Sequence, residues 1–337
     1  MRSITYPDNE EVMYQYDQGG NLFHMTSVKN GVSDTFIDQI DYDKFGNRKS
    51  VHYGNGIVTT YSYDSLQRMV RLRSARGDDN PMQDIIYKFD KVDNITQIND
   101  IADPTNRMGG RSTAYYHYDG LNRLSEATGY SDYGSFSLAM EYSSDGCLAS
   151  KQQRATSMGS CQSCYMESND TYVYGYGKSH APKRIYNCEN DSRYDLRWDA
   201  NGNLGQLSTQ MADELKCRFL FWNEENRMHA VVDDDYFSYY SYDYTGERVL
   251  KLTGESQLMG EDGDQMSIYT VLDNPTLYAS PYMVITPHGY TKHYYAGTNR
   301  LCAKIGGGGL DYTDSLYHQE TIYADIQTSG EVPFDPG

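Results

Sequence analysis

One short motif recurs along most of this 337-residue chain and constrains its fold more than any other feature. An aromatic residue is followed by Asp and, a few residues later, by Gly-Asn, Asn-Arg or a similar pair. The clearest copy reads Tyr-Asp-Lys-Phe-Gly-Asn-Arg over residues 42–48. Copies begin at Tyr16, Tyr42, Tyr63, Phe89, Tyr118, Trp198, Trp222 and Tyr242, with a degraded copy at Tyr142. A motif that returns after about 20 to 30 residues predicts one small supersecondary unit repeated many times.

Segment 53–64 indicates the structure of one unit. Its Asn-Gly pair at 55–56 is a strong hairpin turn signal, because both residues tolerate a positive φ. In the strand that follows, Thr59, Tyr61 and Tyr63 share one face, since side chains alternate along a strand. We expect the Asp at the strand end to accept backbone N–H bonds from the next turn, and the Gly-Asn pair to supply the left-handed geometry. Each repeat therefore predicts a strand, a tight turn and a second, more polar strand.

Neighbouring hairpins must pair edge to edge, because a single hairpin is only marginally stable in water. The sequence therefore predicts an all-β protein, a repeat array of β-hairpins that forms a continuous β-sheet. Apolar residues with Gly, but without Tyr, make up about 37% of the chain, below the roughly 45–50% of globular domains. The 34 Tyr supply the missing burial in this prediction, with their rings stacked along the sheet and their hydroxyls near water.

The residues expected to matter are structural ones at the repeat starts and turns. They are Tyr16, Asp17, Gly20, Asn21, Tyr42, Asp43, Gly46, Asn47, Tyr63, Asp64, Arg68, Tyr118, Asp119, Trp198, Asp199, Gly202, Asn203, Trp222, Tyr242, Asp243 and Gly246. A structural rule explains an Asp in almost every repeat, whereas a single active site does not. No nucleophile elbow, paired-His motif or phosphate loop stands out. We therefore predict no catalytic residue, no enzyme activity and no cofactor.

The motif divides the chain into four stretches. Residues 1–128 form the first Tyr-Asp repeat array, and 129–171 read as a degenerate repeat with an enlarged loop. Residues 172–305 form a second Tyr-Asp repeat array, and 306–337 a Gly-rich turn and polar tail. Because the chain begins and stops in mid-pattern, we expect it to be a piece of a larger array.

Charge and hydropathy exclude two classes of partner. The formal net charge of −18 argues against nucleic acid, whose binding proteins carry basic surfaces. The chain has no run of 18 apolar residues, so the sequence predicts no membrane span. The first residues lack the apolar stretch of a secretory signal peptide, so any export would depend on a signal elsewhere.

Two local patterns suggest metal binding, but neither completes a site. Cys161 and Cys164 form a CxxC pair, yet zinc needs four ligands, and the nearest further candidates are His180 and Cys188. Loop thiols or a local disulfide are favoured over a metal or redox site. The acidic turn at 260–264 lacks the ligand spacing of a calcium loop, which favours a solvated turn. We predict no metal.

The combined pattern resembles the YD-repeat, or Rhs, family over roughly residues 1–305. The resemblance is strongest at 197–204, 222–228 and 242–248, which look like late repeats of bacterial Rhs proteins. Residues 290–300 look like the segment just before the family's core-closing region. The resemblance implies that the repeats wind as a curved, spiral β-sheet into a hollow shell that encloses a C-terminal toxin.

By this resemblance the chain is a non-enzymatic wall segment, secreted or at the bacterial cell surface. Its partners would be the rest of the shell and the enclosed toxin domain. The alternative is surface adhesion or carbohydrate binding, since exposed Tyr and Trp stack on sugar rings. The family's Asp-Pro-x-Gly-Arg closing motif is absent, and 335–337 is only a partial echo of it. Autoproteolysis and toxin activity are therefore assigned to no residue of this chain.

Overall fold

The structure, a computed structural model, is built of β-strands. It describes residues 2–77, 80–103, 110–157, 165–175, 180–212, 214–233, 235–260, 266–272, 274–297, 299–308 and 324–326. Over these residues there are 27 strands and no helix, so the predicted all-β class is confirmed. The chain divides into two compact units, Met1–Asp170 and Thr171–Gly337.

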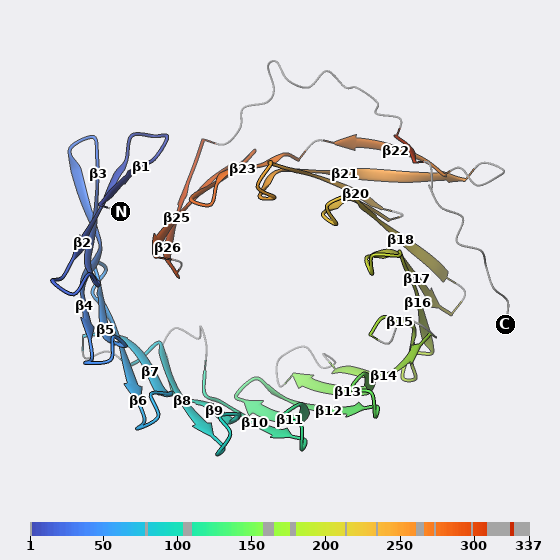
Figure 1. Cartoon of the computed structure of the whole chain (residues 1–337), viewed down its shortest axis with the longest axis horizontal. Coiled ribbons are helices and arrows are strands. Elements are labelled where there is room, and N and C mark those ends of the chain that lie inside the picture. Colours follow the sequence, from blue (N-terminus) through green and yellow to red (C-terminus); the bar gives the residue numbers. More distant parts are fainter. Residues whose placement is uncertain are drawn as a thin grey trace. The chain divides into compact units, whose positions relative to one another are not determined.

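Unit 1 is a single antiparallel sheet in which strands follow one another in chain order (Figure 1). Its strands are β1 (Ser3–Thr5), β2 (Glu11–Tyr16), β3 (Leu22–Lys29), β4 (Val32–Tyr42), β5 (Arg48–Tyr53), β6 (Ile57–Tyr63), β7 (Met69–Arg76), β8 (Gln83–Phe89), β9 (Ile95–Asp100), β10 (Ser112–Tyr118), β11 (Leu124–Ser131), β12 (Gly134–Tyr142) and β13 (Leu148–Ser157). The division between the units falls within β14 (Tyr165–Tyr174). Each strand from β2 to β12 pairs with both chain neighbours, as a hairpin array requires.

Unit 2 repeats this arrangement. Its strands are β15 (Pro182–Asn187), β16 (Ser192–Trp198), β17 (Leu204–Met211), β18 (Glu214–Trp222), β19 (Met228–Val232), β20 (Tyr236–Tyr242), β21 (Arg248–Gly260), β22 (Met266–Leu272), β23 (Thr276–Ser280), β24 (Met283–Thr286), β25 (Gly289–Ala296), β26 (Asn299–Gly306) and β27 (Ala324–Ile326). Strands β15 to β21 pair in chain order. Strand β21 then pairs with both β22 and β23, β22 pairs with β27, and β23 to β26 form a meander. The predicted continuous hairpin array is confirmed.

Every repeat turn has the same backbone geometry. The N–H of Gly46 donates to the Asp43 carbonyl at 3.1 Å, and the N–H of Asp43 donates to the Asn47 carbonyl at 2.8 Å. The third residue after the repeat Asp is left-handed, with φ of 85° at Gly46. This is a type I turn closed by a left-handed residue. The prediction that the Gly-Asn pair supplies this geometry holds for Gly alone, because Asn47 already belongs to the returning ladder.

A β-bulge follows each of these turns. In the Asp43 turn, Tyr42 pairs with Arg48 and Asp41 pairs with Ser50, so Lys49 is the extra residue. The same shift occurs between β2 and β3, β6 and β7, β8 and β9, β10 and β11, β12 and β13, β16 and β17, β18 and β19, and β20 and β21. Such a bulge interrupts the ladder locally and bends the strand.

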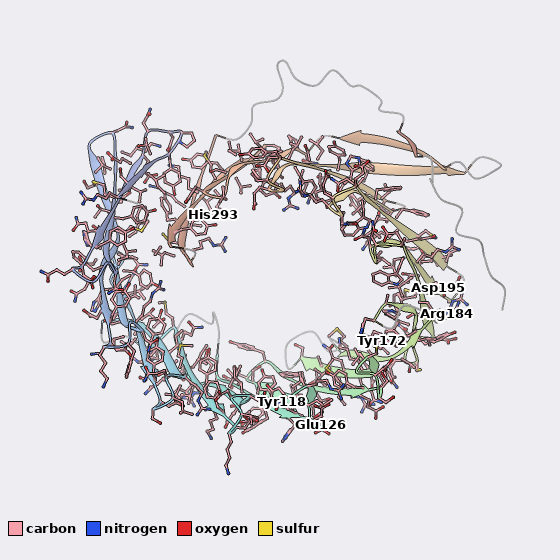
Figure 2. The ribbon with its side chains drawn as sticks, viewed as in Figure 1. Tyr118, Glu126, Tyr172, Arg184, Asp195 and His293 are labelled. Carbon is pink, nitrogen blue, oxygen red and sulfur yellow. The ribbon has the colours of Figure 1, made fainter. Side chains whose placement is uncertain are left out.

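The two faces of the sheet differ in polarity. In β6 the side chains of Thr59, Tyr61 and Tyr63 are more buried than those of Thr60 and Ser62, which confirms the predicted shared face. Buried Ile40, Val51 and Thr59 stand opposite one another across β4, β5 and β6. In β10 and β11, Tyr118 and Glu126 lie on opposite faces (Figure 2). The core is thus one side-chain layer along one face.

Segment 129–171 keeps the regular hairpin pattern where the structure describes it. The degraded copy at Tyr142 still forms the turn, with the N–H of Gly146 donating to the Ser143 carbonyl at 3.0 Å. Strands β12 and β13 pair over their whole length. A Ser in place of Asp therefore preserves the turn backbone.

The left-handed turn position yields a stability prediction at Gly202, which has φ of 87° and open space around its missing Cβ. Gly202→Ala should lower the free energy of unfolding by about 1 kcal/mol, because a Cβ is strained at this φ. Gly202→Asn should cost less, since Asn226 adopts the same conformation at the equivalent position. Urea unfolding measures both. The control is Gly120→Ala, a turn position with equal space but no positive φ, where no loss is expected.

Candidate functional site

The candidate functional site is the row of repeat turns, where the predicted Asp residues lie. In the third turn, Oδ1 of Asp64 accepts the backbone N–H of Leu66 at 2.9 Å and of Arg68 at 3.0 Å. The same pair of acceptor bonds is made by Asp43, Asp90, Asp119, Asn223 and Asp243. The expected bonding of the carboxylate to turn N–H groups is thus observed in both units.

The second carboxylate oxygen binds the side chain four residues later. Nδ2 of Asn47 donates to Oδ2 of Asp43 at 3.1 Å, and Nε of Arg68 donates to Oδ2 of Asp64 at 2.7 Å. Asn21, Asn94, Arg123 and Asn203 bond their own Asp in the same way. Asn and Arg both serve at this position because each places an N–H donor within reach of the carboxylate.

Further bonds join several turns to the following turn, and we call them the turn ladder. In unit 1 the donor of one turn reaches the left-handed residue of the following turn. The bonds are Asn47 Nδ2 to Gln67 Oε1 at 2.8 Å, Arg68 Nη1 to Asp93 Oδ1 at 2.7 Å and Asn94 Nδ2 to Asn122 Oδ1 at 3.0 Å. In unit 2, Asn203 Nδ2 donates to Asn226 Oδ1 at 2.8 Å.

The turn ladder explains why some left-handed positions are not Gly. Asn122 and Asn226 have φ of 60° and 58°, which is strained for residues with a Cβ. Each accepts a hydrogen bond from the preceding turn, and so do Gln67 and Asp93. Where the position is Gly there is no side-chain acceptor, and Arg227 instead donates to the Asp243 carbonyl at 3.3 Å beside Gly246.

The aromatic residue at each repeat start bonds the preceding repeat. Tyr42 donates its hydroxyl to the Leu22 carbonyl at 2.7 Å, and Trp222 donates its indole N–H to the Leu204 carbonyl at 2.8 Å. Tyr63, Tyr118, Tyr142, Trp198 and Tyr242 make equivalent bonds to Arg48, Ile95, Leu124, Pro182 and Met228. These hydroxyls thus satisfy backbone carbonyls of the neighbouring hairpin. Burial raises the pKa of Tyr42, which keeps the hydroxyl a donor.

The bulge produces the carbonyl that these aromatic residues need. Leu22 lies beside the bulge of its hairpin, whereas pairing with the next strand begins only at Met25. Arg48 likewise precedes the pairing with β6, which begins at Ser50. A buried carbonyl left unsatisfied at this position would destabilise the fold.

Phe89 is the repeat-start residue without a polar ring atom. The Arg68 guanidinium carbon lies 4.7 Å from the centre of its ring. Nη1 of Arg68, which also bonds Asp93, donates to the Asp90 carbonyl at 3.1 Å. A cation–π contact and an arginine bond therefore join these two repeats in place of the aromatic hydroxyl bond.

Hydrogen bonds lower the pKa of the turn aspartates. For Asp119 the largest cause is the side-chain bond from Arg123, followed by the Arg123 backbone N–H. For Asp43, burial acts in the opposite direction, and the bonds from Asn47 outweigh it. The pKa is also lowered in Asp17, Asp64, Asp90, Asp199 and Asp243. These carboxylates are ionised and bonded within their own turns.

The structure brings most of the predicted residues into the turn rows. The residues that prediction missed are the ladder acceptors Gln67, Asp93, Asn122 and Asn226 and the donor Asn94. Their constant offset from the repeat Asp was the available signal. Tyr16 is 42% exposed, so the first repeat start is less covered than later ones.

Some predicted features fall outside the described residues. They are Cys161, Cys164 and most of the acidic turn at 260–264. Within the described part, no group of three or more His, Cys, Asp or Glu side chains is placed to hold a metal. No helix in that part is long and apolar enough to cross a membrane.

Repeated hairpins with aromatic-Asp turns define the class of this protein, and known proteins similar to it share this repeat. The RHS repeat family model matches residues 42–79. Toxin subunit YenC2 of Yersinia entomophaga is 25% identical over 263 residues, covering 68% of this chain and 26% of the relative. Toxin subunit YenC1 of the same organism is 28% identical over 142 residues, covering 36% and 15%. These matches confirm the resemblance to the Rhs/YD-repeat family read from the motifs.

Two further comparisons define the extent of this similarity. The tRNA3(Ser)-specific nuclease WapA of Bacillus spizizenii is 25% identical over 228 residues, covering 63% of this chain and 8% of the relative. A solved TcdB2–TccC3 structure matches with a TM-score of 0.50 and 15% identity, covering 89% of this chain and 18% of that one. The fold of this chain is therefore shared with the TcdB2–TccC3 structure. This chain spans about a quarter or less of each relative's length.

The aromatic hydroxyl bond is tested at Tyr242. Tyr242→Phe should lower the free energy of unfolding by about 1–2 kcal/mol, because the Met228 carbonyl loses its donor at 2.7 Å. The control is Tyr244→Phe, two residues away on a ring that is 97% exposed. Urea unfolding should separate the two variants. Equal stability of both would show that the hydroxyl bond contributes nothing.

The lowered aspartate pKa values predict loss of stability in acid. A carboxyl with a lower pKa in the folded state stabilises the fold fully above its unfolded pKa, about 3.9. This stabilisation is lost as the pH falls through the folded pKa. The melting temperature should therefore decline below about pH 4, and less steeply in Asp119→Asn, which lacks one such carboxyl.

Thermal melts between pH 7 and pH 2.5 check this expectation. Asp132→Asn is the matched control, since Asp132 is exposed in a hairpin turn outside the repeat motif. That variant should keep the acid slope of the unmodified protein. An identical slope for Asp119→Asn would contradict the role given to the turn carboxylates.

Proposed function

We propose that this chain is a non-enzymatic wall segment of a YD-repeat shell that encloses a cargo polypeptide. The proposal depends on one observation: the polar side chains of the repeats hydrogen-bond within their own turns or to the neighbouring repeat. In repeat after repeat the Asp is bonded within its turn and the aromatic group bonds its neighbour. Such an arrangement builds a continuous wall and supplies no unique reactive centre.

The similarity to toxin subunits supports the proposal that the cargo is a toxin domain. Both Yersinia relatives are described as toxin subunits. A C-terminal toxin domain enclosed by the shell is the cargo we propose, and further repeats outside this chain are the second partner. Secretion, or display at the bacterial cell surface, follows from the same proposal.

Against enzymatic activity stands the chemistry of the turn carboxylates. A general acid needs a carboxyl with a raised pKa, whereas the pKa of Asp64 and Asp119 is lowered. WapA is described as a nuclease, but the match covers only 8% of it. We therefore assign no catalytic step to this repeat region.

Carbohydrate binding is the second-ranked proposal. Exposed Tyr and Trp rings would stack on sugars, and the two Trp of the chain, Trp198 and Trp222, donate their indole N–H groups to backbone carbonyls of a neighbouring hairpin. Their rings therefore have a structural use. The relatives' descriptions name toxin subunits and a nuclease, which favours the shell over adhesion.

The shell proposal is tested first by sequencing the DNA on both sides of this coding region. We expect further Tyr-Asp repeats and, downstream, a closing motif followed by an unrelated domain in the same reading frame. In the purified full-length product, that domain should resist protease until the repeats are unfolded by urea. The same domain expressed alone is the control and should be cleaved readily. Equal cleavage in both forms would contradict encapsulation.

A further inference from the structure

The tips of four consecutive turns in unit 1 carry large exposed apolar residues. Phe45, Leu66, Val92 and Leu121 are 61%, 66%, 62% and 72% exposed. Each is the second residue after the repeat Asp, so all four occupy one turn position. We call them the apolar tip row.

Turn geometry does not explain this choice of residue. Exposed turn positions favour small and polar residues. In other turns the same position holds Gly19, Asp145, Asn201, Glu225 or Thr245. The position contributes its backbone N–H to the repeat Asp, a bond any of these residues makes. The apolar side chains are thus an addition to the turn, confined to one stretch of the chain.

The turn ladder holds these four tips in order. Bonds between successive turns run from Asn47, Arg68 and Asn94 to the next turn. Each repeat adds two strands, and strands lie about 4.8 Å apart, so successive tips are about 10 Å apart. A partner with the same spacing fits this row best, and a row of turns of the same kind has that spacing.

The exposed tip residues of the two units differ in charge. In unit 1, Lys44 and Lys91 are exposed and lie beside Phe45 and Val92 in the apolar tip row, while the exposed Asp93 is ion-paired with Arg68 at 2.7 Å. In unit 2 the exposed tip residues are acidic: Glu224 and Glu225 in one turn and Glu247 in the next. The last of these turns also exposes an aromatic ring, Tyr244, at 97%. We call this acidic set the unit 2 turn row.

We propose that the apolar tip row of one molecule packs against the unit 2 turn row of a second copy of this chain. Equal spacing and opposite charge carry the pairing, with Tyr244 packed among the apolar tips. A large side chain hides about 150 Å² when fully buried. Because each of the four tips is about two-thirds exposed, together they present on the order of 400 Å² of apolar surface. That is below the roughly 800 Å² per partner of a stable complex, so the association is weak.

The two surfaces differ, so each molecule keeps one free surface of each kind after pairing. Such heterologous contacts continue to a third molecule unless they close into a ring. The average mass should therefore rise beyond that of a dimer as concentration increases. Added salt should reduce the association, because the paired charges are exposed.

The test is sedimentation equilibrium of the full chain over a wide concentration range. The double variant Leu66→Ser with Leu121→Ser should stay monomeric at concentrations where the unmodified chain associates. Its melting temperature should be unchanged, because both side chains are exposed. The matched control is Leu215→Ser, which removes an exposed Leu of unit 2 at 57% exposure outside both rows and should associate normally.

A charge exchange tests the pairing itself. Lys91→Glu and Glu225→Lys should each weaken association about tenfold or more when alone, and a mixture of the two variants should restore it. A chain that is monomeric at every concentration would overturn the proposal. Association that survives the double Ser substitution, or a mixture that does not recover, would also overturn it and would indicate contact through other surfaces.

Discussion

The structure depends on hydrogen bonds that tie each hairpin to its neighbour outside the backbone ladder. Each unit is one sheet layer with a thin apolar face, so the deeply buried side chains, such as Val12, Met25, Val51 and Val232, form a single row of limited depth. The aromatic hydroxyl or indole N–H reaches back one repeat, and the turn ladder reaches forward one repeat. Stability in such an array is mainly a sum of contacts between neighbours.

The β-bulge connects the turn chemistry to the choice of aromatic residue. It leaves a carbonyl two residues before the next pairing begins, and that carbonyl needs a donor at the tip of a long flat side chain. Tyr and Trp both meet this need, which explains why Tyr42 and Trp222 occupy the same position. Phe89 cannot, and Arg68 bonds the neighbouring turn instead.

In each turn, the residues that hold the fold together differ from the exposed residues that could contact a partner. Carboxylates such as Asp64 and Asp119 are bonded within the turns and have lowered pKa values, so they are poor candidates for catalysis. The residue two positions after the repeat Asp donates its backbone N–H to the turn and varies from Gly19 to Phe45 and Thr245. A wall of this design carries its variable chemistry along the turn rows without a change in the sheet.

Much of this protein was determined by its sequence alone. The recurring aromatic-Asp motif predicted strands, turns, pairing order and the bonding of Asp to turn N–H groups, because each of these is local to one hairpin or to two adjacent ones. The tertiary structure decided what crosses between repeats. The link from Tyr42 to Leu22 and the acceptor role of Asn122 needed the register of neighbouring strands, which the bulge shifts by one residue. Motif spacing counts residues along the chain, whereas these bonds depend on which backbone atoms the bulge leaves facing the next hairpin.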